Sequence, residues 1–159
     1  MYECNGRARK GWGMDGMENA IDYVVVVQCD QAMNQVCAGF QCEWAFSARL
    51  DAFARYPADK PVRYLSMSCG GCPGRAVTRK LINLKKGLKK REQRGIESVA
   101  VHLSTCITRS SHHGPKCPHK DAIKHQIELA GFPWVEDSRI SKLTEKRRAE
   151  GMYADEGNE

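Results

Sequence analysis

The sequence predicts an α/β fold in which a parallel sheet carries helices on both of its faces. Three observations predict it. Four consecutive valines at 24–27 form a run typical of strands that are buried on both faces of a parallel sheet. Segments with the apolar spacing of helices alternate along the chain with short strand-like segments. The 159 residues, 42% of them hydrophobic, suffice for one core and not for two.

The first half of the chain supplies two strands and two helices. The valine run predicts a strand over 23–28, and apolar residues at helical spacing predict a helix over 41–55, which Pro57 ends. A second strand is expected over 62–67. A glycine-rich turn follows it directly and leads into a helix with an apolar stripe, which ends before Gly95.

The second half repeats the alternation. A third strand is expected over 98–103, a helix from Pro118 to Gly131, and a short fourth strand over 133–135. The order β-α-β-α-β-α-β requires right-handed crossovers in a three-layer open parallel sheet of about four strands, Rossmann-like or flavodoxin-like. A further short helix is expected over 140–149.

The chain divides into three predicted segments: a flexible N-terminal arm over 1–20, an α/β domain over 21–136 and a charged C-terminal extension over 137–159. Neither a secretory signal nor a membrane span is visible, so we expect a cytoplasmic protein without a membrane partner. The net charge of +6 raises the question of nucleic acid. The basic residues at 85–94 alternate with leucines and lack aromatic neighbours, which indicates the solvated face of a helix, and no nucleic-acid partner is expected.

Eight cysteines are many for a chain of this length, and structural disulfides do not persist in a reducing cytosol. Cys4 lies in the N-terminal arm. The other seven follow predicted strands: Cys29, Cys37 and Cys42 come in the loop after the first, Cys69 and Cys72 after the second, Cys106 and Cys117 after the third. Because parallel strands end at one edge of the sheet, we expect these seven thiols to share that edge, where such folds bind ligands.

A metal site is the leading interpretation of this convergence. Cys69 and Cys72 are spaced so that one turn presents two thiolates to the same ion, and Cys106, Cys117 and His119 are expected to join them. The full set of candidate metal ligands also includes Cys29, Cys37 and Cys42. Thiolate ligands favour zinc or an iron-sulfur cluster, between which the sequence does not decide. His102 lies within a strand and is expected to be a core histidine rather than a ligand.

Three other interpretations remain open. The cysteines are also small apolar residues that pack in cores, which fits Cys29 after the valines. The segment from Cys69 to Arg75 satisfies Cys-x5-Arg between a strand and a helix, which is similar to the phosphate loop of low-molecular-weight tyrosine phosphatases and some arsenate reductases. A Cys-x-x-Cys pair at a helix start is also typical of thiol-disulfide oxidoreductases. The sequence therefore does not decide whether the chain is an enzyme. It also leaves open whether the chain has a protein partner.

The chain resembles the CGGC-domain family, named for the motif that stands here at 69–72. The resemblance extends from 23 to 135 and rests on the residues Gln28, Cys29, Cys37, Cys42, Phe53, Tyr56, His102, Leu103, Ser104, Cys106, Cys117, Pro118 and His119. It implies an α/β domain that binds a metal, zinc first, without a settled activity. Family members often finish with a Gly-Thr-His-like ending, where this chain has Glu-Asp-Ser-Arg at 136–139, so the resemblance implies no ligand there.

Overall fold

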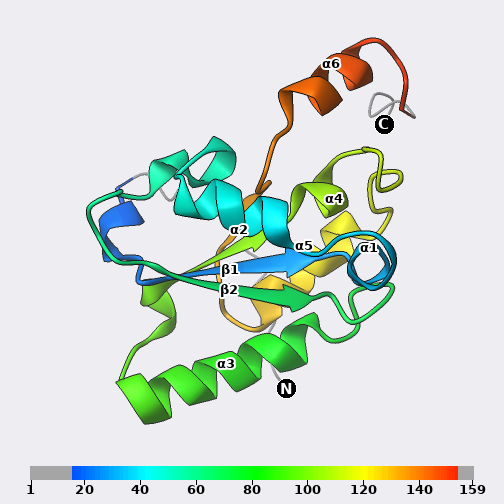
Figure 1. Ribbon diagram of the computed structural model, residues 1–159. Helices are drawn as coiled ribbons and strands as arrows, with labels where there is room; N and C mark the ends of the chain where they lie inside the picture. Colours follow the sequence, from blue (N-terminus) through cyan, green and yellow to red (C-terminus); the bar gives the residue numbers. More distant parts are fainter. Residues whose placement is uncertain (1–15, 154–159) are drawn as a thin grey trace.

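The sheet has four parallel strands in the order β2-β1-β3-β4 (Figure 1). This computed structural model describes residues 16–153, so Cys4 and most of the predicted N-terminal arm lie outside the described residues. The strands are β1 (Tyr23–Gln28), β2 (Arg63–Ser68), β3 (Val99–Leu103) and β4 (Trp134–Glu136). The predicted fold class is confirmed, and each predicted strand agrees with the structure to within about one residue.

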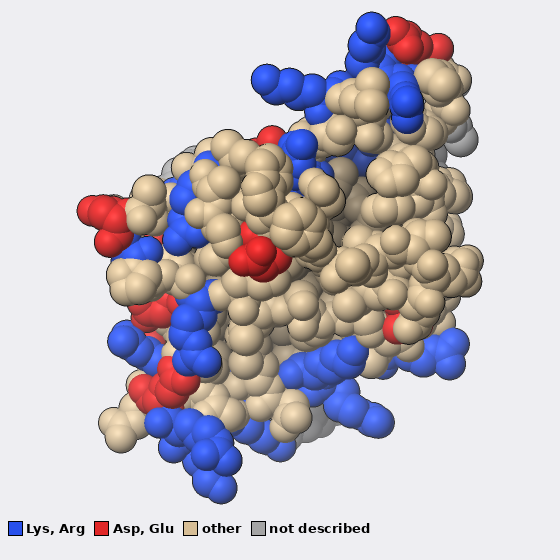
Figure 2. Space-filling view, in the orientation of Figure 1, with Lys and Arg blue, Asp and Glu red and all other residues tan. Residues whose placement is uncertain are grey.

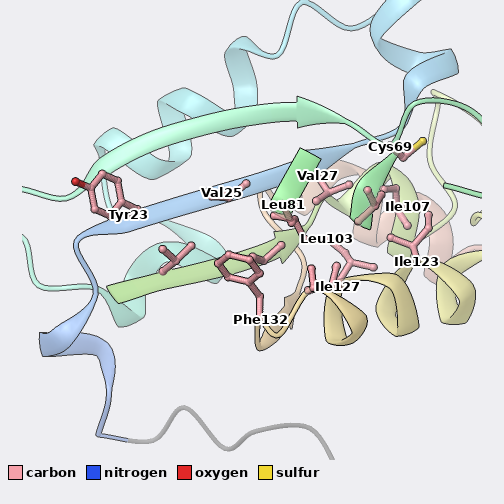
Figure 3. Packing of buried hydrophobic residues seen from close by; sticks show 14 of the residues in the cluster. Tyr23, Val25, Val27, Cys69, Leu81, Leu103, Ile107, Ile123, Ile127 and Phe132 are labelled. Carbon is pink, nitrogen blue, oxygen red and sulfur yellow. The ribbon is translucent and has the colours of Figure 1, made fainter. Parts of the chain in front are cut away.

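Both faces of the sheet are covered, because β1 sends alternate valines to opposite sides. Val25 and Val27 belong to a core beneath α3 (Val77–Glu92) and α5 (Lys120–Leu129), which Figure 3 shows from close by. Val24 and Val26 belong to a second core beneath α2 (Phe40–Ser47) and the 3-10 turn η2 (Asp51–Arg55). The valine run is therefore explained by burial on two sides.

The predicted helix over 41–55 is wrong in its length, because the segment divides into α2 and η2. Arg49, with a φ of 52°, takes the left-handed conformation after α2. Its N–H donates to the carbonyl of Phe46 at 3.0 Å, and the N–H of Leu50 donates to that of Ala45 at 2.8 Å. This pair of bonds is a Schellman motif, which closes the last turn of a helix. Its usual glycine is absent here, so the sequence showed no stop signal.

Two short helices were not predicted: α1 (Asp30–Gln35) directly after β1 and α4 (Thr105–Thr108) directly after β3. Neither is long enough to show an apolar period, since one needs about two turns to be visible. A related correction concerns Cys42, which lies in the first turn of α2 and not in a loop. The remaining predicted helices are confirmed. α3 ends at Glu92 and is followed by Gln93 in the left-handed conformation, two residues before Gly95.

The segment after β4 leads to α6 (Lys142–Ala149), which stands at the top of Figure 1. The predicted short helix is confirmed, and Ser141 caps it by accepting a hydrogen bond from the N–H of Thr144. Asp137 and Ser138, between β4 and this helix, are buried. Two further 3-10 turns, η1 (Glu18–Ala20) and η3 (Ile96–Ser98), precede strands. Among residues 16–153, no helix has the length and apolarity to cross a bilayer.

Candidate metal centre

The thiols gather where β1, β2 and β3 end, on the side of Figure 1 toward which the arrowheads of β1 and β2 point. Gln28 pairs with Ser68 at the ends of β1 and β2, so Cys29 and Cys69 are the next residues of two neighbouring strands. The ladder continues one step past β2, because the N–H of Cys69 donates to the carbonyl of Gln28 at 2.8 Å. Strand register therefore places these two cysteines side by side.

One group of thiols surrounds Cys117. Burial raises the pKa of Cys117, a hydrogen bond from the backbone of His119 lowers it, and the nearby Cys29, Cys72 and Cys69 raise it further as thiolates. Like charges act in this way only at short range, so these four side chains are neighbours. We call Cys29, Cys69, Cys72 and Cys117 the four-thiol group. The N–H of Cys117 donates to the carbonyl of Ile107 at 3.0 Å, which holds the loop against α4.

Backbone amides point at two sulfur atoms of this group. The N–H of Asp30 donates to Cys69 Sγ at 3.4 Å, and the N–H of His119 donates to Cys117 Sγ at 3.4 Å. Such donors stabilise sulfur in its thiolate form. Cys69 is buried, whereas Cys72 is exposed, so the group extends from the core to the solvent.

A second group contains Cys106 and Cys42, both of which line a cavity that the four-thiol group does not reach. Burial raises the pKa of Cys106, and hydrogen bonds from Ser104 and from the backbone of Cys29 lower it. Burial is the larger effect, and the pKa is about 11. The Cys29 and Cys42 thiolates raise this pKa further. Cys106 Sγ lies 2.8 Å from Ser104 Oγ, and Cys42 Sγ lies 3.2 Å from Ser138 Oγ. Cys106 is therefore held as a neutral, hydrogen-bonded thiol.

The donor chemistry of these groups fits a thiophilic metal, whereas a finished coordination geometry is not present. All seven cysteines of the described part are free thiols. Among residues 16–153, no three Cys, His, Asp or Glu side chains are arranged so that they could hold a metal ion. Sulfur atoms of the four-thiol group would have to move toward one another to bind one. Several of these thiols also pack on the core, as the alternative interpretation of cysteine as a small apolar residue expects.

The two histidines of the prediction have different surroundings. His102 is fully buried between Tyr56, whose hydroxyl lies 2.7 Å from Nε2, and the carbonyl of Asp137, 2.8 Å from Nδ1. Burial lowers the pKa of His102 to about 4. The prediction of a core histidine is confirmed. His119 stands at the start of α5, with its backbone turned to Cys117, and its role as a ligand stays a prediction.

The Cys-x5-Arg segment does not have the arrangement that a phosphate loop uses. The guanidinium of Arg75 donates from Nε and Nη2 to the carbonyl of Cys72, at 3.2 and 2.9 Å, on the exposed surface of the turn. Gly70 and Gly71 both have positive φ, and Pro73 offers no N–H. Arg75 thus closes its own turn, and this geometry gives no support to oxyanion binding.

Sequence reasoning missed Gln28 as a functional candidate. Its side chain is only 2% exposed, and neither its amide nitrogen nor its amide oxygen has a hydrogen-bond partner in the described part of the chain. Gln28 is one of the residues that line a cavity of about 480 Å³, together with Cys37, Cys42 and Cys106. The available signal was a polar amide at the end of an otherwise apolar buried strand, where burial without a partner is costly.

The fold and the site define a class: an α/β domain with free thiols gathered at the carboxyl edge of a parallel sheet. The model of the CGGC domain matches residues 23–139, most of the chain, and the protein belongs to this family. The resemblance drawn from the sequence is thus confirmed. No curated protein and no solved structure matched the chain.

Proposed function

We propose that the chain binds a metal ion through the four-thiol group, with zinc as the expected metal and an iron-sulfur cluster as the alternative. The observation that carries this proposal is that Cys29, Cys69 and Cys72 all lie close enough to Cys117 to raise its pKa, although the four residues come from three separate loops. Four thiolates are a complete ligand set for tetrahedral zinc. The CGGC domain family, whose cysteines suggest metal binding, supports the same conclusion.

The structure also suggests how the site works on metal uptake. The exposed Cys72 gives the ion a first contact with solvent access, and the buried Cys69 and the partly buried Cys117 follow. Burial keeps Cys117 protonated in the metal-free chain at neutral pH, so binding releases protons. The bound ion would replace repulsion between thiolates with attraction and would join three loops that are otherwise held by the sheet and by hydrogen bonds such as the one from Asp30 N–H to Cys69 Sγ. His119, beside Cys117, is a candidate donor that could take the place of one of the four thiolates.

Anaerobic titration of the reduced, metal-free chain with zinc tests this proposal, with isothermal calorimetry and elemental analysis as readouts. We expect one zinc ion per chain and a weakening of roughly tenfold or more in Cys72→Ser and Cys117→Ser. Cys37→Ser is the matched control, because Cys37 lies outside the four-thiol group, and it should bind zinc as the wild type does. Equal affinity in all four proteins, or no binding in the wild type, would contradict the proposal.

Thiol-disulfide exchange is a second candidate for the Cys69 and Cys72 pair, favoured by the exposure of Cys72 three residues from a buried free thiol. In this reaction the two thiols lose two electrons and two protons to a disulfide such as oxidised glutathione, which becomes two thiols, and a Cys69 to Cys72 disulfide forms. Equilibration with glutathione buffers should then give a reduction potential of about −270 to −120 mV. A pair that stays reduced across these buffers would exclude this role.

A further inference from the structure

A cavity of about 480 Å³ is lined by Cys37, Cys42 and Cys106 and by none of the four thiols of the four-thiol group. Its walls come from the segment between α1 and α2, from the start of α4, from the loop at 111–113 and from residues 138–148. Its volume is in the range of pockets that hold small organic molecules. Neither Cys69, Cys72 nor Cys117 lines it, so the cavity is a site of its own.

Gln28 is the residue at this cavity whose polar atoms are buried without a partner on both sides of an amide. The side chain is 2% exposed, and both polar atoms lack a partner. A Cβ built at Gly39, whose φ is 78°, would lie 3.5 Å from Gln28 Oε1 and 3.6 Å from Nε2, so the chain passes close to the amide. A buried amide without hydrogen bonds destabilises a fold. Its presence in the wall of a cavity indicates that a ligand supplies the missing donor and acceptor.

Apolar side chains at the cavity are unusually exposed. Val36 is 65% exposed and Phe40 is 61% exposed, and both line the cavity beside the start of α2. Figure 2 shows that Lys and Arg gather over α3 at the lower edge and on α6 at the top, with a largely uncharged surface between them. Exposed apolar residues beside a cavity are typical of a binding site for an apolar body.

The charged side chains at the cavity form ion pairs with one another or with neighbouring residues, although the buried Nε of Arg139 has no hydrogen-bond partner in the described part of the chain. Arg139 donates from Nη1 to Asp51 at 2.7 Å, and Arg148 pairs with Glu145. Glu145 also pairs with Arg109 at 3.0 Å. A neutral ligand therefore fits the cavity better than an anion, which would have to compete with these carboxylates.

We propose that this cavity binds a small neutral molecule with an apolar or aromatic body and a planar carboxamide or lactam edge. Binding requires the Gln28 amide, whose two polar atoms are buried, to turn toward the cavity. The N–H of such an edge then donates to Gln28 Oε1 while its carbonyl accepts from Nε2, in the bidentate manner of paired amides. The apolar body then covers Val36 and Phe40. The proposal does not depend on the metal site, because none of the four thiols lines the cavity. The two sites are adjacent in sequence only at Gln28 and Cys29.

Benzamide is the probe that tests the proposal, and two-dimensional NMR of the full chain is the measurement. We expect saturable shifts of the Gln28 side-chain amide and of the Phe40 backbone, with a dissociation constant in the millimolar range that suits a fragment. N,N-dimethylbenzamide lacks the N–H donors and should bind about tenfold more weakly or worse. The absence of saturation with benzamide, or equal binding of the two probes, would overturn the proposal.

Gln28→Met provides the matched variant, since it keeps the side-chain length and removes the amide. We expect benzamide binding to weaken by about tenfold or more. The same variant should unfold at a higher temperature than the wild type, because it removes an unpartnered buried amide, so loss of binding would not reflect loss of the fold. Gln35→Met, on the exposed surface of α1, should leave binding unchanged. Undiminished binding in Gln28→Met would refute the proposal.

Two further measurements separate this proposal from the metal site. Benzamide binding should be the same in Cys72→Ser, and the same with and without a chelator. If zinc binding fails in the wild type while benzamide binding is retained, the metal proposal falls and this one stands. If benzamide binding disappears with Cys72→Ser or with the chelator, the independent pocket is refuted.

Discussion

At the scale of single residues, two buried polar side chains differ in whether their polar atoms have hydrogen-bond partners. His102 has a partner for each ring nitrogen, in Tyr56 and in the carbonyl of Asp137, and it also packs against the ring of Phe53 at 4.9 Å. Gln28, on the neighbouring strand, has no partner for either amide atom. Since buried polar groups are normally satisfied, the first residue is explained by structure and the second by a ligand.

His102 makes the stability of the fold depend on pH. Its pKa falls from the ordinary 6.5 to about 4 because burial disfavours the charged ring. The unfolded chain therefore binds a proton between these values that the folded chain does not. The free energy of unfolding is thus highest above pH 6.5 and decreases as the pH falls, by about 3 kcal/mol when the pH reaches the folded pKa.

Urea unfolding of the reduced, chelator-treated chain at several pH values between 7 and about 4 measures this dependence. His102→Gln keeps a polar side chain that does not titrate, and the difference between its pH profile and that of the wild type isolates the contribution of His102. Parallel profiles for the two proteins would contradict the assignment of a neutral buried histidine.

The candidate residues themselves were predictable only in part. The placement of Cys29, Cys69 and Cys117 after strands follows from the sequence, because strand order fixes the edge to which these residues come. Which thiols face one another does not follow, since it depends on side-chain directions in loops. The structure divides the cysteines between the four-thiol group and the cavity, with Cys37, Cys42 and Cys106 at the latter.

At the scale of elements, the turn between β2 and α3 depends on close packing around its glycines. A Cβ at Gly70 would lie 2.2 Å from the Cβ of Ala76, and one at Gly74 would lie 2.7 Å from Cγ1 of Ile123 in α5. Both glycines have positive φ. The motif is therefore constrained by backbone conformation and by helix packing, whatever its thiols bind.

Gly74→Ala tests this constraint. We expect a loss of about 2–4 kcal/mol in the free energy of unfolding, since the left-handed strain and the contact with Ile123 add. Gly87→Ala is the matched control, because Gly87 lies within α3 with open space around it. Alanine there should raise stability by about 0.5–1 kcal/mol. Chemical denaturation measures both, and a neutral Gly74→Ala would contradict the packing described.

The contact between α3 and α5 is a second property of the elements. Leu81 of α3 and Ile127 of α5 are fully buried in the same core. We expect Leu81→Ala to lower the free energy of unfolding by about 2–5 kcal/mol, through lost burial and a cavity. Ile82→Ala, one residue further and 38% exposed, should cost about 1 kcal/mol or less. Similar losses at the two positions would show that α3 packs on a different face.

At the scale of the whole molecule, the segment after β4 holds the cavity side of the protein together. The carboxylate of Asp137 accepts hydrogen bonds from the hydroxyl of Thr108 and from Arg109 Nε and Nη2, the latter two at 3.1 and 2.7 Å. Arg109 also pairs with Glu145 of α6. This network joins α4, the end of the sheet and α6, and thus positions the wall of the cavity.

Asp137→Asn should therefore lower the free energy of unfolding and also loosen the wall of the cavity. Asparagine tolerates the positive φ of 73° at this position, so the substitution removes charge without adding backbone strain. We expect a loss of about 1–2 kcal/mol, less than for a fully buried pair because Arg109 is 30% exposed. Asp59→Asn, on the exposed surface, is the control for denaturation experiments. An unchanged midpoint in Asp137→Asn would contradict the role given to this network.

The sequence by itself determined the layers, the strands and the edge at which seven cysteines collect. The reason is that apolar periodicity and the succession of strands and helices can be read directly along the chain. Only the tertiary structure decided where α2 ends, which thiols are neighbours and that Gln28 lines a cavity. These features depend on contacts between residues far apart in the chain, such as Cys29 with Cys117 and Cys42 with Ser138. Side-chain neighbours of this kind are set by packing, which no spacing along the chain encodes.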